Sequence, residues 1–301
     1  MSEKKPGASG RKNMILNVVM IVCIAAILVC GLQITRSLIE YKKAKDKNDG
    51  LSDIMSGLLE STTIATTIQT STTAPVSTET SVGETEDTSV TETTKPEPIP
   101  REQYREIYTQ LTTMKAQYPE LYGWIHIEFD EKHVINLPVM QSEDNNMYYI
   151  DHAYDGTESM AGAIFADYRN TARRLDFNQN LILYGHHMNN GTIFAYVSSQ
   201  YKIREKFDSA SIVVYSLDGV YTFNAFAVYN AKAGDDFDRI GFADGSLKEY
   251  CIAKQRKSYF SKNLTFDDVD TIVTLVTCTN FGSDGRVIVH GVLESYDPFF
   301  D

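Results

Sequence analysis

The residues best suited to chemistry lie in TIVTLVTCTNFGSDGRVIVHGVL, residues 271–293. An apolar, β-branched run ends at Cys278, a polar loop follows, and a second apolar run begins with Arg286. If the two runs are neighbouring antiparallel strands, the loop brings Cys278 opposite Arg286, with Cβ atoms about 5 Å apart. The thiolate is the nucleophilic form of cysteine, and a nearby cation lowers the thiol pKa from about 8.5. A guanidinium also donates hydrogen bonds to an oxyanion or a peptide carbonyl, so this pair predicts a nucleophilic site.

Two structural roles compete with a nucleophilic role for Cys278. A thiol at a strand end can be a small buried core residue, and an arginine there can form an ordinary ion pair. The chain has four cysteines, and Cys23 and Cys30 fall in an apolar N-terminal segment. A disulfide between Cys251 and Cys278 is therefore the other alternative for a domain outside the cell.

A cysteine that cleaves amides needs a proton donor for the leaving amine, usually a histidine. In NLILYGHHMNNGTIF, residues 180–194, an apolar run ends and the chain enters a polar turn at His186 and His187, before a short predicted helix. Functional groups are often placed where a strand leads into a loop. This context favours His186 or His187 as the proton donor.

The remaining histidines have weaker contexts. By the two-residue period of a strand, His290 shares a face with Arg286 and is an alternative proton donor. His126 and His133 lie in or beside strand-like runs, which favours structural or surface roles. The histidine pair has no acidic or cysteine partner at zinc-like spacing, and no acidic loop has calcium-site spacing, so we expect no metal and no cofactor.

The chain has 301 residues, 43% hydrophobic content and a formal charge of -12, which argues against a nucleic-acid partner. Residues 14–34 carry no charge and span about 30 Å as a helix, the apolar thickness of a bilayer. They lack an obvious small-residue cleavage site, which favours a retained anchor over a signal peptide. Basic residues flank both ends, so the expected orientation, with residues 1–13 cytoplasmic, rests on the composition of the following segment.

Residues 35–100 are predicted to connect the anchor to an outer domain. Residues 37–60 are charged and predict a juxtamembrane helix. Residues 61–100 are dominated by Thr, Ser, Glu and Pro without an aromatic residue, which predicts an extended, disordered tether. A threonine-rich stalk is typical of a protein held at a cell surface.

Residues 101–301 are predicted to form the outer domain. Residues 101–119 predict an amphipathic helix closed by Pro119, and residues 246–260 predict a late helix with Cys251 on its apolar side. Regular short runs with turn residues between them predict an antiparallel sandwich or barrel. The strand-like runs are residues 123–127, 133–140, 162–166, 181–184, 211–216, 219–230, 271–278 and 286–293.

TLVTC (274–278), the downstream Arg286 and the upstream YGHHM (184–188) together resemble the sortases, membrane-anchored cysteine transpeptidases of Gram-positive cell surfaces. YPELYGWIHIEF (118–129), GAIFADYRN (162–170) and the long insertion with a helix before the cysteine strand are similar to class B in particular. The combination is specific, whereas any one of these motifs alone is not.

The resemblance covers roughly residues 101–295 and implies a mainly β fold, an eight-stranded β-barrel with an N-terminal helix and an inserted helix before the cysteine strand. It implies His186 as the catalytic histidine, Cys278 as the nucleophile and Arg286 as the catalytic arginine. Asn280 stands where some class B members carry an acidic residue, which leaves open whether anything besides backbone orients His186.

The implied activity is transpeptidation at a C-terminal sorting signal of the Asn-Pro-x-Thr type. Cys278 would attack the threonine carbonyl, His186 would protonate the leaving amine, and a peptidoglycan amino group would resolve the thioester. The implied partners are secreted proteins with such a signal, the cell-wall precursor and the membrane, with the catalytic domain extracellular. Alternatives are a pilin-polymerising sortase, a hydrolase of the same fold, and a non-catalytic surface binding module.

Overall fold

The computed structural model describes residues 8–69, 101–170, 179–243, 245–278 and 284–300, with the backbone alone at 8–14, Ile54, 58–69, Arg101, Gln103 and Cys278. The chain divides into two compact units, residues 1–47 and 48–301. Asn280 lies outside the described residues.

The N-terminal helix α1 (Ala8–Gln69) contains the predicted anchor, residues 14–34. Among the described residues it is the one helix that is long and apolar enough to cross a membrane, by length and composition. The predicted helix at residues 37–60 is present. Residues 61–69, predicted as the start of an extended tether, are helical in the structure, and residues 70–100 lie outside the described residues. Extending an existing helix adds a hydrogen bond for each residue ordered, without a new nucleation step.

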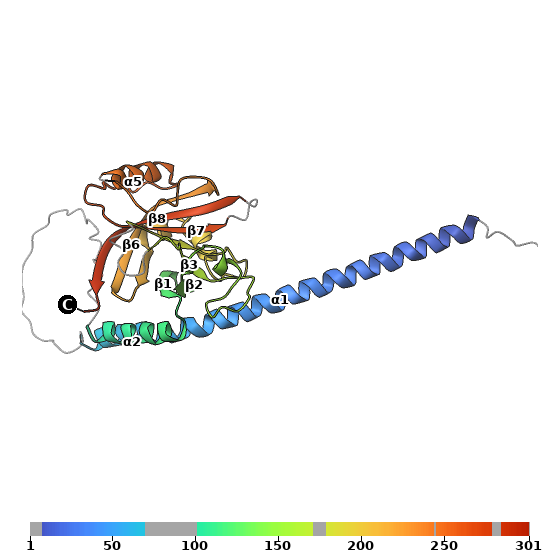
Figure 1. The fold of residues 1–301 in the computed structure, drawn as a ribbon, viewed down its shortest axis with the longest axis horizontal. Helices are drawn as coiled ribbons and strands as arrows, with labels where there is room; N and C mark the ends of the chain where they lie inside the picture. Colours follow the sequence, from blue (N-terminus) through green and yellow to red (C-terminus); the bar gives the residue numbers. More distant parts are fainter. Residues whose placement is uncertain (1–7, 70–100, 171–178, 244, 279–283, 301) are drawn as a thin grey trace, which may run out of the picture. The chain divides into compact units, whose positions relative to one another are not determined.

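The second unit contains a closed barrel of eight strands, which confirms the expected fold (Figure 1). Around the barrel the order is β1-β2-β3-β4-β7-β8-β6-β5. The strands are β1 (Leu121–Asp130), β2 (His133–Met140), β3 (Ile164–Ala166), β4 (Asn180–Tyr184), β5 (Ser211–Tyr215), β6 (Gly219–Lys232), β7 (Ile272–Cys278) and β8 (Gly285–Pro298).

The barrel is mixed, so the expectation of a purely antiparallel arrangement was wrong. β2 pairs with β3 in parallel, and β4 pairs with β7 in parallel. Parallel partners need a long crossover between them, and the long connections between these strands allow it. The β4–β7 pairing matters for the site, because parallel neighbours end on the same side of the barrel.

Helices cover parts of the barrel. The predicted helices at residues 101–119, in the turn after β4 and at residues 246–260 are all present, whereas α4 and η1 were not predicted. The helical elements after α1 are α2 (Arg101–Gln117), the 3₁₀ turn η1 (Tyr148–Ile150), α3 (Ala195–Gln200), α4 (Arg204–Ser209) and α5 (Ser246–Lys257). In α5, Leu247 and Cys251 are both buried, as expected for its apolar face, and Cys251 is a free thiol, which removes the disulfide alternative.

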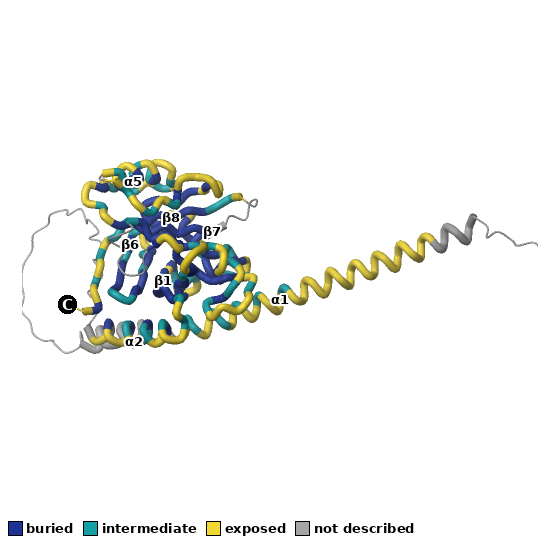
Figure 2. Tube along the Cα trace, in the orientation of Figure 1, coloured by how far each residue is buried: buried dark blue, intermediate teal, exposed yellow. Residues whose placement is uncertain are grey.

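Two buried clusters hold the second unit together. One joins α2, through Ile107 and Leu111, to Trp124 of β1, and the other packs α5 against β6, β7 and β8. Figure 2 shows the buried strands in dark blue and the exposed outer faces of the covering helices in yellow. Burial of this apolar surface is the main source of stability for the barrel that carries the site.

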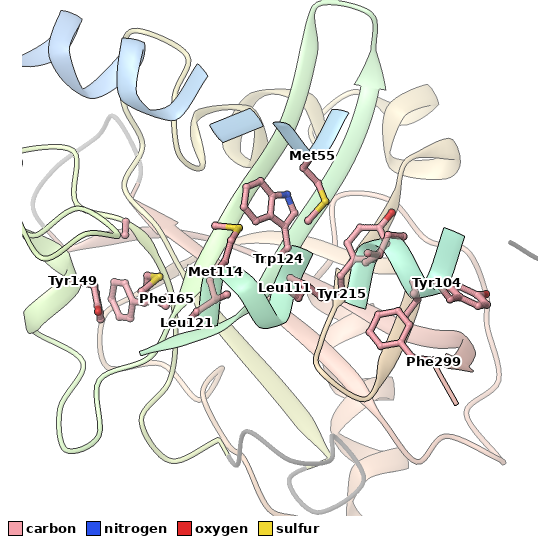
Figure 3. Packing of buried hydrophobic residues seen from close by; sticks show 14 residues of the cluster. Met55, Tyr104, Leu111, Met114, Leu121, Trp124, Tyr149, Phe165, Tyr215 and Phe299 are labelled. Atoms are coloured by element: carbon pink, nitrogen blue, oxygen red, sulfur yellow. The ribbon is translucent and has the colours of Figure 1, made fainter. Parts of the chain in front are cut away.

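The C-terminal part of α1 also contacts the barrel. Met55, with 1% of its surface exposed, belongs to the cluster that contains Trp124 (Figure 3). Asn136 of β2 accepts a hydrogen bond from Trp124 Nε1 at 2.7 Å. Its amide nitrogen donates to Ser52 O at 3.1 Å and to Ser56 Oγ at 2.9 Å. These contacts make residues 52–56 part of the folded second unit.

Candidate active site

The strand order brings the three residues implied by the sequence to one end of the barrel. Cys278, the last residue of β7, is the register partner of Arg286 in β8. On its other side, β7 runs parallel to β4, with Val276 paired to Tyr184. Since β4 and β7 end together, His186, two residues beyond Tyr184, emerges beside the end of the cysteine strand.

The turn that carries His186 is closely packed. Gly185 N donates to Val276 O at 3.1 Å, which continues the β4–β7 ladder to the residue before His186. A Cβ atom at Gly185 would lie 2.8 Å from Phe194 Cδ2 and 2.9 Å from Ile193 Cγ2. A side chain at this position would push the turn away from the barrel, so the glycine fixes where His186 leaves the strand.

A cleft of about 290 Å³ opens at this end of the barrel. His186 and Arg286 both line it, as does Thr277, the residue before Cys278. The predicted histidine and arginine therefore lie around the same cleft as the residue that precedes the predicted nucleophile. Its other lining residues are Asn146, Met147, Ile150, Phe165, Tyr184, Gly185, Ala233, Phe237, Asp238 and Val276.

The His186 side chain is half-buried, and its Nε2 donates a hydrogen bond to Ile150 O at 2.8 Å. A carbonyl oxygen only accepts, so in the neutral imidazole Nε2 carries the hydrogen and Nδ1 has the lone pair. The backbone of η1 thus selects one tautomer of His186. The orienting group found here is thus a backbone carbonyl.

Arg286 is the second residue of β8 and is partly exposed beside the cleft. Its Nη1 donates to Gly285 O at 3.0 Å. A guanidinium here adds a fixed positive charge and several N–H donors to a cleft that peptide backbone can enter.

The two rival histidines lie elsewhere. His290 is fully buried, with Nε2 hydrogen-bonded to Tyr229 Oη at 2.9 Å and Nδ1 to Thr274 Oγ1 at 2.8 Å. Burial lowers its pKa well below the ordinary value, with smaller contributions from nearby lysines, so it is neutral. Its ring packs 5.7 Å from that of Tyr250 in α5, and it is not among the residues that line the cleft.

His187 also does not line the cleft. Its Nδ1 is hydrogen-bonded to Ser198 Oγ of α3, and its backbone forms a bridge with Ile193. Burial, and then the charge of Lys202, lower its pKa. These contacts give His187 a structural place in the turn after β4.

Sequence reasoning did not identify the polar residues behind the cleft wall. Asp167, directly after β3, is buried and accepts hydrogen bonds from Asn146 and Tyr184, which both line the cleft. The available signal was an acidic residue that ends the apolar run GAIFAD, followed by an arginine two positions later. Within the described part of the chain, no group of three His, Cys, Asp or Glu side chains is arranged to hold a metal ion.

Comparisons with known proteins point to one family. The family model described as Sortase domain matches residues 131–294. The chain is 30% identical to "Sortase B" of Listeria monocytogenes over 197 residues, 62% of this chain and 75% of that protein. The X-ray structure of Clostridium perfringens sortase B aligns with a TM-score of 0.54 at 26% identity, covering 61% of this chain and 99% of that one. A Staphylococcus aureus sortase B–substrate complex aligns with a TM-score of 0.55 at 25% identity, covering 64% of this chain and 92% of that one.

Proposed function

The chain belongs to the sortase family of cysteine transpeptidases, in class B, and on this basis we propose that it cleaves a C-terminal sorting signal of the Asn-Pro-x-Thr type after the threonine. The cleaved protein is then transferred to an amino group of peptidoglycan. The observation that carries the proposal is the shared barrel end, where Cys278 is the register partner of Arg286 and His186 and Arg286 line one cleft.

In the proposed first step, Cys278 Sγ bonds to the threonine carbonyl carbon, and the carbonyl oxygen gains negative charge. Arg286 donates hydrogen bonds to this oxygen or to neighbouring substrate backbone, as an oxyanion-stabilising group does. When the C–N bond breaks, protonated His186 gives its Nδ1 proton to the departing amine while Nε2–H stays on Ile150 O. A thioester remains on Cys278.

The second step reverses these roles. An acceptor amine attacks the thioester carbon, and His186 takes the proton that the amine loses. The C–S bond breaks and the thiolate of Cys278 leaves. A new amide then joins the substrate threonine to the acceptor. One amide bond is broken and one is formed, so the reaction needs no external energy source.

Sortases are cell-surface enzymes, and the apolar part of α1 supplies an anchor of suitable length. We propose that residues 14–34 are this anchor, with residues 1–13 in the cytoplasm and the barrel outside. In that position the cleft meets secreted proteins as they leave the membrane and cell-wall precursors as they are delivered to the surface.

A cleavage assay tests the proposed function. Residues 48–301, one compact unit, would be incubated with an Asn-Pro-Gln-Thr peptide that carries a fluorophore and a quencher. We expect cleavage after threonine, loss of cleavage in Cys278→Ala, and retention in the matched variant Cys251→Ala, whose thiol is buried on the inner face of α5. Mass spectrometry should detect the acyl group on Cys278 only.

The acceptor separates the remaining candidates. Transfer to a short peptidoglycan-type amine supports cell-wall anchoring, whereas transfer to a lysine-containing pilin-type peptide supports pilin polymerisation. Release of the free threonine acid with either amine present supports a hydrolase. Equal cleavage by wild type and Cys278→Ala would refute the proposed nucleophile.

A further inference from the structure

Asp167 is a buried carboxylate with an unusual number of partners. It follows β3 directly, and none of its side chain is exposed. Arg169 donates to it three times, from its backbone N at 3.0 Å and from Nε and Nη2 at 2.8 Å each. Burial alone would raise the pKa of Asp167, but the hydrogen bonds and charge of Arg169 outweigh burial and hold the pKa below its usual value. The carboxylate is therefore ionised and fixed in place.

Two further hydrogen bonds connect Asp167 to the cleft wall. Its Oδ2 accepts from Tyr184 Oη at 3.0 Å and from Asn146 Nδ2 at 2.9 Å. The same asparagine accepts a hydrogen bond on Oδ1 from Tyr168 N at 2.8 Å, so its amide bridges the two segments. Both Tyr184 and Asn146 are thereby held against the segment that follows β3.

These two connections lead to the two segments that position His186. Tyr184 ends β4 two residues before His186, so it sets where the chain enters the turn. Asn146 begins the segment that runs through η1 to Ile150, whose carbonyl accepts the hydrogen bond from His186 Nε2 at 2.8 Å. One carboxylate therefore fixes both the strand that carries the imidazole and the segment that selects its tautomer.

Arg169 connects the network to a further cleft-lining residue, Asp238. Its Nη2 donates to Asp238 O at 3.1 Å and to Asp238 Oδ2 at 3.3 Å. Asp238 lies in the long connection between β6 and α5 and lines the cleft. The Asp167–Arg169 pair thus joins three walls of the cleft that are far apart in the sequence.

We propose that Asp167, paired with Arg169, is a positioning residue for His186 in the transfer reaction. The kinetic test of this inference rests on the proposed function. The hydrogen bonds that position His186 can be tested without it. Only the carboxylate of this ion pair is buried, and taking it out of water offsets much of the attraction to the partly exposed Arg169, so fold stability alone gives a weak reason for the pair. A displacement of about 1 Å in a catalytic group can cost about 100-fold in rate, which gives a strong reason to fix the two segments that position the ring.

The kinetic test compares Asp167→Asn, Tyr184→Phe and the double variant in the full-length chain in detergent. For Asp167→Asn we expect kcat for the sorting peptide to fall about 10- to 100-fold, with a smaller change in KM. Tyr184→Phe, which removes one hydroxyl, should lower kcat by less. Because both variants break the same hydrogen bond, between Tyr184 Oη and Asp167 Oδ2, their effects should not add in the double variant. Asp208→Asn is the matched control, since it breaks the exposed Arg204–Asp208 pair of α4 and should leave kcat unchanged.

An NMR readout does not depend on any substrate. With labelled histidine, the Nε2–H signal of His186, assigned from a His186→Gln sample, should be protected from exchange in wild type and lose protection in Asp167→Asn. Normal kcat and a protected signal in Asp167→Asn would overturn the proposal, as would losses that only follow the folded fraction measured by circular dichroism. If wild type cleaves no peptide, the proposed function fails, and the NMR comparison still decides the positioning role.

Discussion

Cys278 and Arg286 lie directly opposite each other in the β7–β8 register, at the end of the barrel where β4 also ends. The pairing of β7 with β8 therefore fixes the position of Arg286 relative to Cys278. The three proposed catalytic residues come from three adjacent strands or their exits, so their relative positions depend on the β4-β7-β8 order.

Arg286 should contribute through its charge and its planar donors. Arg286→Ala is expected to lower kcat for peptide cleavage about 10²- to 10³-fold, the usual cost of removing an oxyanion donor. Arg286→Lys keeps the charge but loses the two-pronged donor geometry, so it should recover only part of this activity. Steady-state kinetics on residues 48–301 would measure both, and a fully active lysine variant would show that charge alone suffices.

His186 and His187 are adjacent but should differ sharply on substitution. His186→Gln removes the proposed proton donor and is expected to cost about 10²- to 10⁴-fold in kcat. His187→Gln loses only its contact with Ser198 and should keep kcat within a few-fold, which makes it the matched control. Similar losses in both variants would mean that the turn as a whole, and not one imidazole, carries the effect.

His290 should make stability depend on pH below neutrality. Burial lowers its pKa in the folded state, so below about pH 6.5 the unfolded chain binds a proton at this site that the folded chain does not. The free energy of unfolding should therefore decrease as pH falls below about 6.5, by up to about 1.4 kcal/mol per pH unit from this group. Above that range His290 is neutral in both states and contributes no slope.

Urea denaturation of residues 48–301 at pH 7.5, 6.5 and 5.5 would test this dependence. His290→Gln should be less stable at pH 7.5, because two buried hydrogen bonds are disturbed, yet its stability should fall less between pH 6.5 and 5.5. An unchanged slope would assign the acid sensitivity to other groups.

The contact between α1 and the barrel should be measurable through Trp124, the single tryptophan of the chain. Met55→Ala is expected to cost about 2–5 kcal/mol of stability if the cavity does not collapse, and Asn136→Ala about 1–3 kcal/mol from the unpaired Nε1. Both should shift the Trp124 emission to longer wavelength as water reaches the ring. Met160→Ala is the control at an exposed methionine, and a red shift there of equal size would contradict a local effect.

Much of the fold follows from local sequence patterns, because strands and helices show their periods within a few residues. The strand-like runs and the helix at residues 246–260 depend only on neighbouring side chains, and the structure confirms them. The parallel pairing of β4 with β7 could not be predicted in this way, because it depends on the path of the long connection between them.

The same distinction explains what could be predicted of the site. His186, Cys278 and Arg286 stand beside clear strand ends, so local context and the family resemblance singled them out. The shared strand face of His290 and Arg286 suggested a rival, and only the packing of α5 over His290 removed it. Asp167 was missed because its link to the cleft depends on Asn146 and Tyr184, which come from separate segments that meet it only in the folded chain.

If residues 14–34 anchor the enzyme and the barrel lies outside, as proposed, the hydrogen bonds from Asn136 to Ser52 and Ser56 affect its shedding from the cell surface. Residues 52–56 belong to the same helix, α1, as the apolar N-terminal segment. They are connected to the barrel in two ways, by non-covalent contacts and by the chain through residues 70–100. A surface protease that cut within residues 70–100 would leave two fragments associated through Met55, Trp124 and Asn136. Release of the enzyme into the medium would then be governed by dissociation of this small interface, and not by the cut itself.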